Sequence, residues 1–467
     1  MFYFEKKTHA HTQHIHNTHM AKSSTPTQPQ LAPELAKLYA DNNVEGVEEF
    51  LAAASKNAGT SRRFIRFNPR FSAEDTFEVL KAEGIEPVPV LWLDEKLGFY
   101  NIPGEFSLHK SRAYVDGRIY GMDVSSGAAV AALDLLPQIH SEDDSSSTAP
   151  VMKVLDLCCC PGLKLCAIAD LLEMKKYESG DSATVVGVDI CPQRMQVCKK
   201  IVRKYHFDCE TSGRETSSAG DLQASARIRL FCEDGTTFGM KKVAVAADDS
   251  SSRKGNDRGL VFDSLSEQQE THSISTNAKR KRMNKSARAR ERKRLKQYAS
   301  QSITGEDGVS DDNDSRVEQV FDRVLVDAEC STDGSTKHLL EQIKKMSKDT
   351  DEKCVKVSTK VIRDNAGKLD DLHELQRELI TSGFRLLKEN GVMVYSTCSL
   401  SKEQNEDIVS YLLQSFPNAC LMAVDGIDAS DLSNSISVGE LGLRFSITGD
   451  FGGGFFLSKI GKIKVNS

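Results

Sequence analysis

The alternation of strand-like and helix-like segments from residue 151 onward constrains the fold more than any other feature of the chain. The expected strands are 153–157, 184–189, 228–232, 320–327 and 391–396, and the expected helices are 163–172, 192–205, 370–388 and 401–414. Strands that alternate with helices of this length form parallel sheets with helices on both faces. The sequence therefore predicts an α/β fold with a doubly wound, mostly parallel sheet. The segments 443–447 and 454–459 predict an antiparallel hairpin at its edge.

A smaller unit precedes this sheet. Its expected elements are a strand at 62–67, a helix at 73–83 and a strand at 88–93, after which a helix at 125–136 opens the next domain. Ser72 is a suitable N-cap for the first of these helices, and Gly84 ends it. The β-α-β pattern is too short for a catalytic domain. We therefore expect a small α+β module over residues 31–112 and a main domain over 113–467.

Two polar segments interrupt or precede these domains. Residues 1–30 are rich in His, Thr, Gln and Ser, which predicts a disordered tail. Residues 241–318 are rich in Ser, Asp, Asn and Gln, and a structureless loop of this length predicts a disordered insert in the main domain. The insert carries a basic run at 279–296. Such a run is either a nuclear-localisation or nucleic-acid patch, or simply a solvated helix.

Composition excludes several classes of protein. No stretch approaches the ~20 apolar residues of a membrane helix, and residues 1–30 do not have the pattern of a secretory signal. The 12 cysteines lie mostly within apolar strand patterns, which favours reduced thiols in the cytosol or nucleus. The run from Cys158 to Cys160 lacks the paired spacing and nearby histidines of a zinc site, so we expect no metal there.

Chemically active side chains follow two of the expected strands. Cys398 lies just beyond the strand at 391–396, and Cys330 lies just beyond the strand at 320–327, with Asp327 beside it. Ligands of parallel α/β sheets bind beyond the carboxyl ends of the strands, so both thiols are expected to face one crevice. The alternative is that both cysteines pack in the core, because free cysteine is among the most buried residue types.

A second group of strand ends predicts a nucleoside site. The first strand runs into a turn at Pro161 and Gly162, where glycine lets the backbone approach a ligand. Asp189 ends the next strand and is placed to accept both ribose hydroxyls, while Asp234 follows the third strand and could accept the adenine amino group. A single glycine turn leaves NAD possible. Because the turn lacks the three-glycine pyrophosphate cradle, the pattern favours S-adenosylmethionine.

These motifs, in this order, resemble the Fmu/Sun family of S-adenosylmethionine-dependent RNA (cytosine-5) methyltransferases over roughly residues 60–240 and 318–460. The matching segments are Asp123-Val124-Ser125-Ser126, the loop from Asp156 to Leu165, the segment from Asp327 to Gly334, and Ser396-Thr397-Cys398-Ser399. The resemblance implies a Rossmann-like methyltransferase with S-adenosylmethionine as cofactor.

The resemblance also implies roles for individual residues. Cys398 would attack C6 of the cytosine, Asp327 would bind the base near N3, and Cys330 would assist loss of the C5 proton and release of the enzyme. The implied cofactor-binding residues are Cys158, Cys159, Cys160, Pro161, Gly162, Leu163, Lys164, Asp189, Arg194, Asp234 and Asp327. Lys164 could instead contact the base or the Asp327 carboxylate.

The chain departs from the family pattern at several positions. Cys159 and Cys160 replace two alanines, and Leu163 and Leu165 replace a glycine and a threonine. Glu329 stands where the family has proline. A carboxylate beside two thiols would raise their pKa, and could slow the enzyme.

The partner implied by the resemblance is RNA, with tRNA placed ahead of rRNA. The module arginines Arg62, Arg63, Arg66 and Arg70 would then supply phosphate contacts. We expect a monomer without membrane or metal partners, in the nucleus or nucleolus, with the cytoplasm or mitochondrion as other possible locations. The alternative function is a weakly active or non-catalytic RNA-binding scaffold for ribosome biogenesis. DNA methylation is disfavoured by the same resemblance.

Overall fold

The structure is a computed structural model of the 467-residue chain. It describes residues 30–31, 33–42, 47–48, 62–135, 151–174, 183–207, 226–240, 259–266, 320–335, 356–357, 368–427, 436–447 and 453–464. The predicted tail up to residue 29 and the basic run at 279–296 lie outside these residues.

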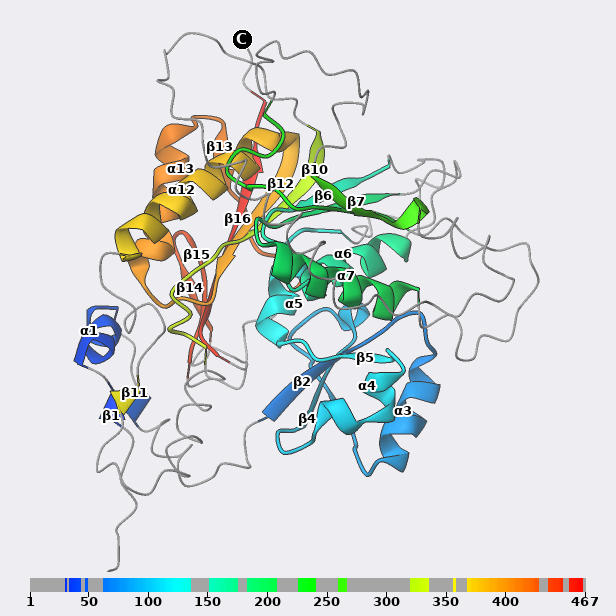
Figure 1. The fold of residues 1–467 in the computed structure, drawn as a ribbon. Coiled ribbons are helices and arrows are strands. Elements are labelled where there is room, and N and C mark those ends of the chain that lie inside the picture. Colours follow the sequence, from blue (N-terminus) through cyan, green and yellow to red (C-terminus); the bar gives the residue numbers. More distant parts are fainter. Residues whose placement is uncertain are drawn as a thin grey trace, which may run out of the picture.

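A mixed sheet with a parallel centre forms the main domain (Figure 1). Its parallel strands are β6 (Lys153–Asp156), β7 (Thr184–Val188), β8 (Arg227–Phe231), β10 (Phe321–Asp327) and β12 (Leu387–Thr397). They lie in the order β12-β10-β6-β7-β8, so the chain moves outward in one direction from β6 and in the other direction from β10. The predicted doubly wound arrangement is confirmed, and its switch point lies between β6 and β10.

Antiparallel strands extend both sides of this centre. They are β9 (Leu260–Asp263), β13 (Ala419–Leu421), β14 (Ile436–Gly439), β15 (Gly442–Phe445) and β16 (Phe455–Lys462). β15 and β16 pair antiparallel as predicted, but β16 lies between β15 and β12, so it is buried on both sides and β14 forms the edge.

The predicted insert also contains a piece of the sheet. β9 pairs with β8, and Asp263 accepts hydrogen bonds from the Arg227 guanidinium. The prediction of continuous disorder over residues 241–318 is therefore wrong for residues 259–266. A four-residue strand surrounded by polar sequence gives too weak a periodic signal to be recognised. The rest of the insert lies outside the described residues.

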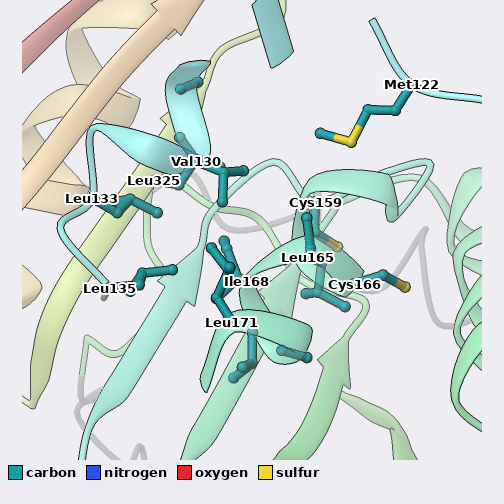
Figure 2. Packing of buried hydrophobic residues seen from close by; sticks show 14 of the residues in the cluster. Met122, Val130, Leu133, Leu135, Cys159, Leu165, Cys166, Ile168, Leu171 and Leu325 are labelled. Atoms are coloured by element: carbon teal, nitrogen blue, oxygen red, sulfur yellow. The ribbon is translucent and has the colours of Figure 1, made fainter. Parts of the chain in front are cut away.

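Helices cover both faces of the sheet (Figure 1). One face packs against α5 (Val124–Ala131), α6 (Leu163–Glu173) and α7 (Pro192–His206), and the other packs against α12 (Lys368–Leu386) and α13 (Glu406–Ser415). In Figure 2, Leu165, Ile168 and Leu171 of α6 lie among the apolar side chains of the first face. Leu165 is fully buried, and a Cβ on Gly187 would come within 2.4 Å of its Cδ1. Leucine at position 165, where the family has threonine, thus has room because Gly187 faces it.

The predicted helix at 401–414 is broken near its start. Residues Lys402–Gln404 form a short 3₁₀ turn, η5, and α13 begins only at Glu406. The Asn405 side chain accepts a hydrogen bond from the Thr397 hydroxyl and donates one to the Ser399 carbonyl. Because these contacts hold Asn405 outside helical geometry, the helix starts later than its periodicity suggests.

The small module is a four-stranded antiparallel sheet with one main helix. It contains β2 (Arg62–Phe67), α3 (Ala73–Ala82), β3 (Val88–Pro89), β4 (Phe99–Pro103), α4 (Arg112–Val115) and β5 (Ile119–Tyr120). Ser72 caps α3 by accepting from the Asp75 amide, and Gly84 follows with a φ of 77°. The predicted strand at 88–93 is only two residues long. Since β5 pairs with β2, the module extends beyond the expected boundary at residue 112.

Buried ion pairs attach the module to α6. Asp170 is completely buried, and it accepts hydrogen bonds from Arg66 at 2.6 Å, from the Tyr120 hydroxyl at 2.8 Å and from Arg70. Arg70 also pairs with Glu173. The prediction that Arg66 and Arg70 contact phosphates is therefore wrong, because internal carboxylates already neutralise both guanidinium groups.

The other two module arginines give less support to that prediction. Arg63 donates to the Phe106 carbonyl at 3.1 Å, within the module. The Arg62 side chain lies outside the described residues.

The remaining elements belong to neither of the two main units. They are β1 (Gln30–Leu31), α1 (Pro33–Asp41) and β11 (Lys356–Val357), and β1 pairs parallel with β11. The Tyr39 hydroxyl of α1 donates to the Asp333 carbonyl at 2.7 Å, which joins α1 to a loop beyond β10. Among the described helices, none has the length and apolar character needed to cross a membrane.

Candidate functional site

The candidate site lies at the carboxyl ends of β6, β7, β10 and β12. In an open α/β sheet, the crevice forms where the chain reverses its direction of travel, which here is between β6 and β10. The loop from Cys158 to Gly162 leaves β6 at this point, while the segments after β10 and β12 carry the two strand-end cysteines.

The structure brings the two predicted cysteines into contact. The Sγ atoms of Cys330 and Cys398 are 3.1 Å apart, although the residues are 68 positions apart in the sequence. Cys330 is buried and Cys398 is half-buried. Core packing alone would not require the segments after two different strands to place their sulfur atoms at the same point. The two thiols therefore meet at the carboxyl edge of the sheet, and their opening to a shared crevice stays a prediction.

Asp333 holds these two loops together. Its carboxylate is completely buried and accepts hydrogen bonds from the Ser399 hydroxyl and the Leu400 amide, each at 2.8 Å, and from the Ser331 hydroxyl. The Gly334 amide donates to the Cys398 carbonyl at 3.0 Å. Sequence reasoning missed Asp333, whose only signal was a carboxylate three residues after Cys330. Its role is to fix the relative positions of the two thiols.

Asp327 has two partners in the crevice. Lys164 donates to its Oδ2 at 2.7 Å, and the Ser396 hydroxyl donates to its Oδ1 at 2.7 Å. Burial lowers the pKa of Lys164, but the neighbouring Asp327 carboxylate outweighs burial and leaves that pKa above its ordinary value. The thiol of Cys398 acts on Lys164 in the same direction. Lys164 is thus a charged ammonium beside both Asp327 and Cys398.

The main causes of the raised pKa of Cys330 do not include Glu329. The pKa of Cys330 is raised well above its usual value, first because Cys330 is hydrogen-bonded to Cys398 and then because it is buried. Charge on Cys398 and on Asp333 adds to this shift, whereas Glu329 is not among its causes. The Glu329 side chain is exposed, and its backbone carbonyl accepts a hydrogen bond from Gln376. Its charge is therefore screened by solvent.

The predicted nucleoside side of the crevice is organised around Asp189. Its Oδ1 accepts from the Cys191 amide at 2.9 Å, and Arg194 lies 3.5 Å from its Oδ2. Arg194 also donates to the Cys160 carbonyl at 2.8 Å, which ties α7 to the cofactor loop. Burial raises the pKa of Asp189 to about 6. Asp234 is exposed beyond β8 and accepts from the amide and hydroxyl of Thr236.

The loop after β6 has mixed exposure. Cys158, Leu163 and Lys164 are half-buried, Cys159, Cys160 and Gly162 are buried, and Pro161 is exposed. Gly162 has a φ of 111°, and a Cβ there would lie 2.8 Å from the Cys198 sulfur, so only glycine fits this turn. Packing against Cys198 thus accounts for this glycine, and the predicted close approach of the backbone to a ligand stays a prediction.

A buried carboxylate that the sequence analysis did not single out lies at the start of this loop. Asp156 is 1% exposed, and in the described part of the chain neither of its carboxylate oxygens has a hydrogen-bond partner. Burial raises its pKa well above the ordinary value, and the Asp327 charge adds to this effect. A buried polar group without a partner is costly, which indicates that a ligand supplies the missing hydrogen bonds.

Comparison with known proteins supports this interpretation of the strand ends. Residues 260–460 match the family model described as 16S rRNA methyltransferase RsmB/F. This part of the chain is similar to the RsmB/F family. The matched range contains Asp327, Cys330 and Cys398, whereas Asp189 and the loop after β6 precede it. The RsmB/F match therefore covers the predicted catalytic half of the site.

Curated relatives of the RsmB/F domain are similar over a shorter stretch. Ribosomal RNA small subunit methyltransferase F of Klebsiella pneumoniae is 33% identical over 101 residues, which is 22% of this chain and 17% of that protein. The protein of the same name from Psychromonas ingrahamii is 33% identical over 97 residues, which is 21% of this chain and 16% of that protein. The similarity thus spans less than a fifth of each relative.

The fold outside the RsmB/F match is also shared with a solved structure. The crystal structure of NSun6 from Pyrococcus horikoshii with SFG has a TM-score of 0.50 and 15% sequence identity, and the match covers 93% of this chain and 99% of that one. This likeness confirms the fold of the chain.

Proposed function

We propose that this protein is an S-adenosylmethionine-dependent RNA methyltransferase that modifies C5 of cytosine through a covalent cysteine adduct. The observation that carries the proposal is the 3.1 Å contact between the Cys330 and Cys398 sulfurs, beside an Asp327 carboxylate held by Lys164. Cytosine C5 becomes nucleophilic only after a group adds to C6. A thiolate is suited to that addition, and a second acid–base group is needed to complete the reaction.

Residues of the chain fit the proposed cofactor. Asp189 would accept hydrogen bonds from the ribose hydroxyls, with Arg194 and the Cys160 carbonyl fixing the loop next to it. The unpartnered Asp156 carboxylate fits the positively charged amino acid part of S-adenosylmethionine, since a cation would satisfy the buried oxygens and lower the pKa of Asp156. When bound, this cofactor supplies an electrophilic methyl group on a sulfonium.

Cys398 is the nucleophile in this mechanism. Its thiolate forms a bond to C6, because the thiolate is the nucleophilic form of cysteine. Asp327 accepts a hydrogen bond from the base edge and stabilises the adduct near N3, while Ser396 and Lys164 hold the carboxylate in place. The base must be unpaired or flipped for its C6 and C5 to reach these groups.

Cys330 is the second acid–base group. Its pKa is raised mainly by the hydrogen bond with Cys398, so it stays protonated while Cys398 is a thiolate. After C5 has taken the methyl group, the Cys398 sulfur is a neutral thioether, and the Cys330 thiol proton passes to solvent. The Cys330 thiolate then takes the C5 proton, the C6–sulfur bond breaks, and 5-methylcytosine and free Cys398 thiolate result.

We propose ribosomal RNA as the first substrate to test. The sequence analysis placed tRNA ahead, but the named relatives are ribosomal RNA small subunit methyltransferases. We retain the nucleus or nucleolus as the proposed location because of the basic run at 279–296. A tagged wild-type chain found outside the nucleus would contradict the proposed location, and a chain that stays nuclear after that run is deleted would show that the run does not direct it there.

A trapping experiment tests the mechanism. Wild-type protein, Cys330→Ala and Cys398→Ala are each incubated with labelled rRNA or tRNA and S-adenosylmethionine, and are then run on a denaturing gel. We expect Cys330→Ala to accumulate a denaturation-resistant protein–RNA band, because attack and methyl transfer proceed without release. Cys398→Ala should give neither the band nor methylated RNA.

Two outcomes would contradict the proposal. A band trapped by Cys398→Ala instead of Cys330→Ala would show that the two roles are reversed. Absence of both methylation and adduct in all three proteins, on RNA to which they bind, would favour the non-catalytic scaffold. Cys420→Ala serves as the matched control, because Cys420 is a half-buried free thiol on β13 that takes no part in the site.

A further inference from the structure

Three buried thiols converge beneath the cofactor loop. Cys159 and Cys160 follow β6, and Cys198 lies on α7, yet their sulfur atoms all lie within 4.8 Å of one another. All three side chains are at most 7% exposed. The expectation that no metal binds at residues 158–160 was based on the missing paired spacing and nearby histidines, but the structure brings a third cysteine from α7 to this point.

We propose that Cys159, Cys160 and Cys198 form a three-thiolate site for a zinc ion, which fastens the cofactor loop to α7. Zinc–thiolate bonds of about 2.3 Å place tetrahedral sulfurs about 3.8 Å apart, which lies within the limit observed for this cluster. Thiolate ligands select zinc or cuprous ions, whereas magnesium and calcium prefer oxygen ligands.

The surroundings of the cluster favour a bound cation. Coordination transfers the thiol protons to solvent and changes no oxidation state. Three thiolates and a divalent zinc ion leave one negative charge, and the Arg194 guanidinium at the Cys160 carbonyl compensates for it.

The packing around the sulfurs is tight. A Cβ on Gly162 would lie 2.8 Å from the Cys198 sulfur, and a Cβ on Gly187 would lie 2.9 Å from the Cys159 sulfur. Glycines at these two positions give the cysteines the room they occupy between the loop, β7 and α7. The side chains of Asp189 and Cys160 are hydrogen-bonded to each other. An ion bound to Cys160 would therefore also affect Asp189 at the proposed ribose site.

A second acidic cluster shows why the thiols are the stronger candidate. Asp170, Glu173 and His206 also lie within coordinating distance of one another. Arg66 and Arg70 already form ion pairs with the Asp170 carboxylate, and Arg70 forms a second ion pair with Glu173. A cation there would have to displace two guanidinium groups. In the described part of the chain, the three thiols form side-chain hydrogen bonds with one another and with Asp189, and with no cationic side chain.

Cadmium titration of the full, reduced chain tests the site. Cadmium replaces zinc on thiolates and gives an ultraviolet charge-transfer band, which the histidine-rich segment near the N-terminus cannot produce. We expect the wild-type band to saturate at one equivalent per chain and to disappear when zinc is added. A Cys159→Ala, Cys160→Ala double variant restores the residues of the family loop, and should lose the band while keeping its circular dichroism.

Two further variants sharpen this test. Cys198→Ala should weaken zinc binding at least ~100-fold, since even the loss of outer-shell groups costs 10–100-fold in metal affinity. Cys166→Ala is the matched control, because Cys166 is another buried thiol on α6 that does not belong to the cluster (Figure 2). It should bind like the wild type.

Three results would overturn the proposal. The first is a wild-type chain with titratable free thiols and no band. The second is a band that persists in both cluster variants, which would place the thiolate ligands elsewhere, for example at Cys330 and Cys398. The third is a cadmium band that a large excess of zinc does not reduce, which would refute the assignment to zinc. Cys330→Ala and Cys398→Ala leave the thiol cluster intact, so a failure of the trapping assay and a failure of the zinc assay can be distinguished.

Discussion

Removing the Asp170 carboxylate should destabilise the protein more than any surface change, because this group neutralises buried positive charge. Arg66 is 1% exposed and Asp170 is fully buried, and their side chains are joined at 2.6 Å. Tyr120 and Arg70 donate to the same carboxylate. In Asp170→Ala, the Arg66 guanidinium would remain buried with only the Leu97 carbonyl as its other hydrogen-bond partner.

The size of the effect follows from the geometry and from the pKa. Breaking a buried ion pair by removing one partner costs about 3–5 kcal/mol. Burial alone would raise the pKa of Asp170, but Arg70 and Arg66 outweigh it and lower that pKa to about 2, from 3.8. A shift of this size corresponds to about 2 kcal/mol of stability at neutral pH. Asp170→Asn, which keeps the shape but loses the charge, should cost roughly that smaller amount.

The pH dependence has a definite sign. The folded pKa lies below the unfolded pKa, so this contribution is fully present above pH ~4 and is lost as the pH falls towards 2. The difference between wild type and Asp170→Asn should therefore shrink over that window. A difference that grew on acidification would contradict the assigned ion pairs.

Urea unfolding followed by fluorescence is a suitable assay. Trp92 is the only tryptophan of the chain, and its ring centroid lies 6.0 Å from that of Phe445, so it reports on the region where the module meets the main domain. Lys81→Ala is the control, because Lys81 forms only an exposed pair with Glu78 and should change stability by less than ~0.5 kcal/mol. A loss below about 1 kcal/mol in Asp170→Ala would refute the reasoning.

Three further predictions concern the site. Affinity for S-adenosylmethionine, measured by calorimetry, should fall as the pH falls through about 6, because protonated Asp189 no longer accepts two ribose hydrogen bonds; Asp189→Asn should flatten this dependence. Lys164→Met leaves the Asp327 carboxylate without its cation and should lower kcat at least ~10-fold with a smaller change in KM, and an unchanged kcat would exclude an electrostatic role. Glu329→Pro should alter turnover no more than about fivefold, since an exposed charge contributes ~1 kcal/mol at most, and a large gain would show that Glu329 does suppress ionisation of Cys330.

The parts of the fold that sequence could predict are those with strong periodicity. Strand β2 has the predicted bounds, β6, β7 and β10 differ from prediction by one residue at one end, and β8 is shifted by one residue. These strands are buried apolar runs bounded by polar residues, so burial and sequence pattern coincide. The short strands β3, β9 and β14 were misjudged or missed, because two to four residues carry too little pattern and their conformation depends on a neighbouring strand.

The candidate site was predictable to the extent that it follows from strand ends. Parallel strands bring their carboxyl ends to one edge, and this rule alone placed Cys330 and Cys398 together. The partners that hold the thiols, above all Asp333, were not predictable, because a loop carboxylate gives no signal of the hydroxyls and amides it will accept from. Asp156 was overlooked for the opposite reason, since an aspartate within an apolar strand resembles an ordinary strand end until its burial is known.

The roles of charged residues were the hardest feature to predict from the sequence. Arg66 and Arg70 have the composition of a phosphate-binding patch, yet Asp170 and Glu173 neutralise both. Glu329 stands beside a thiol in the sequence, yet its exposure removes its influence on the pKa of Cys330. Each charge acts according to its burial and its nearest opposite charge, and neither can be read from the residue type. The same reasoning applies to the cluster of Cys159, Cys160 and Cys198. Three ionisable sulfurs are buried together there, and among the described residues no cationic side chain is hydrogen-bonded to any of them.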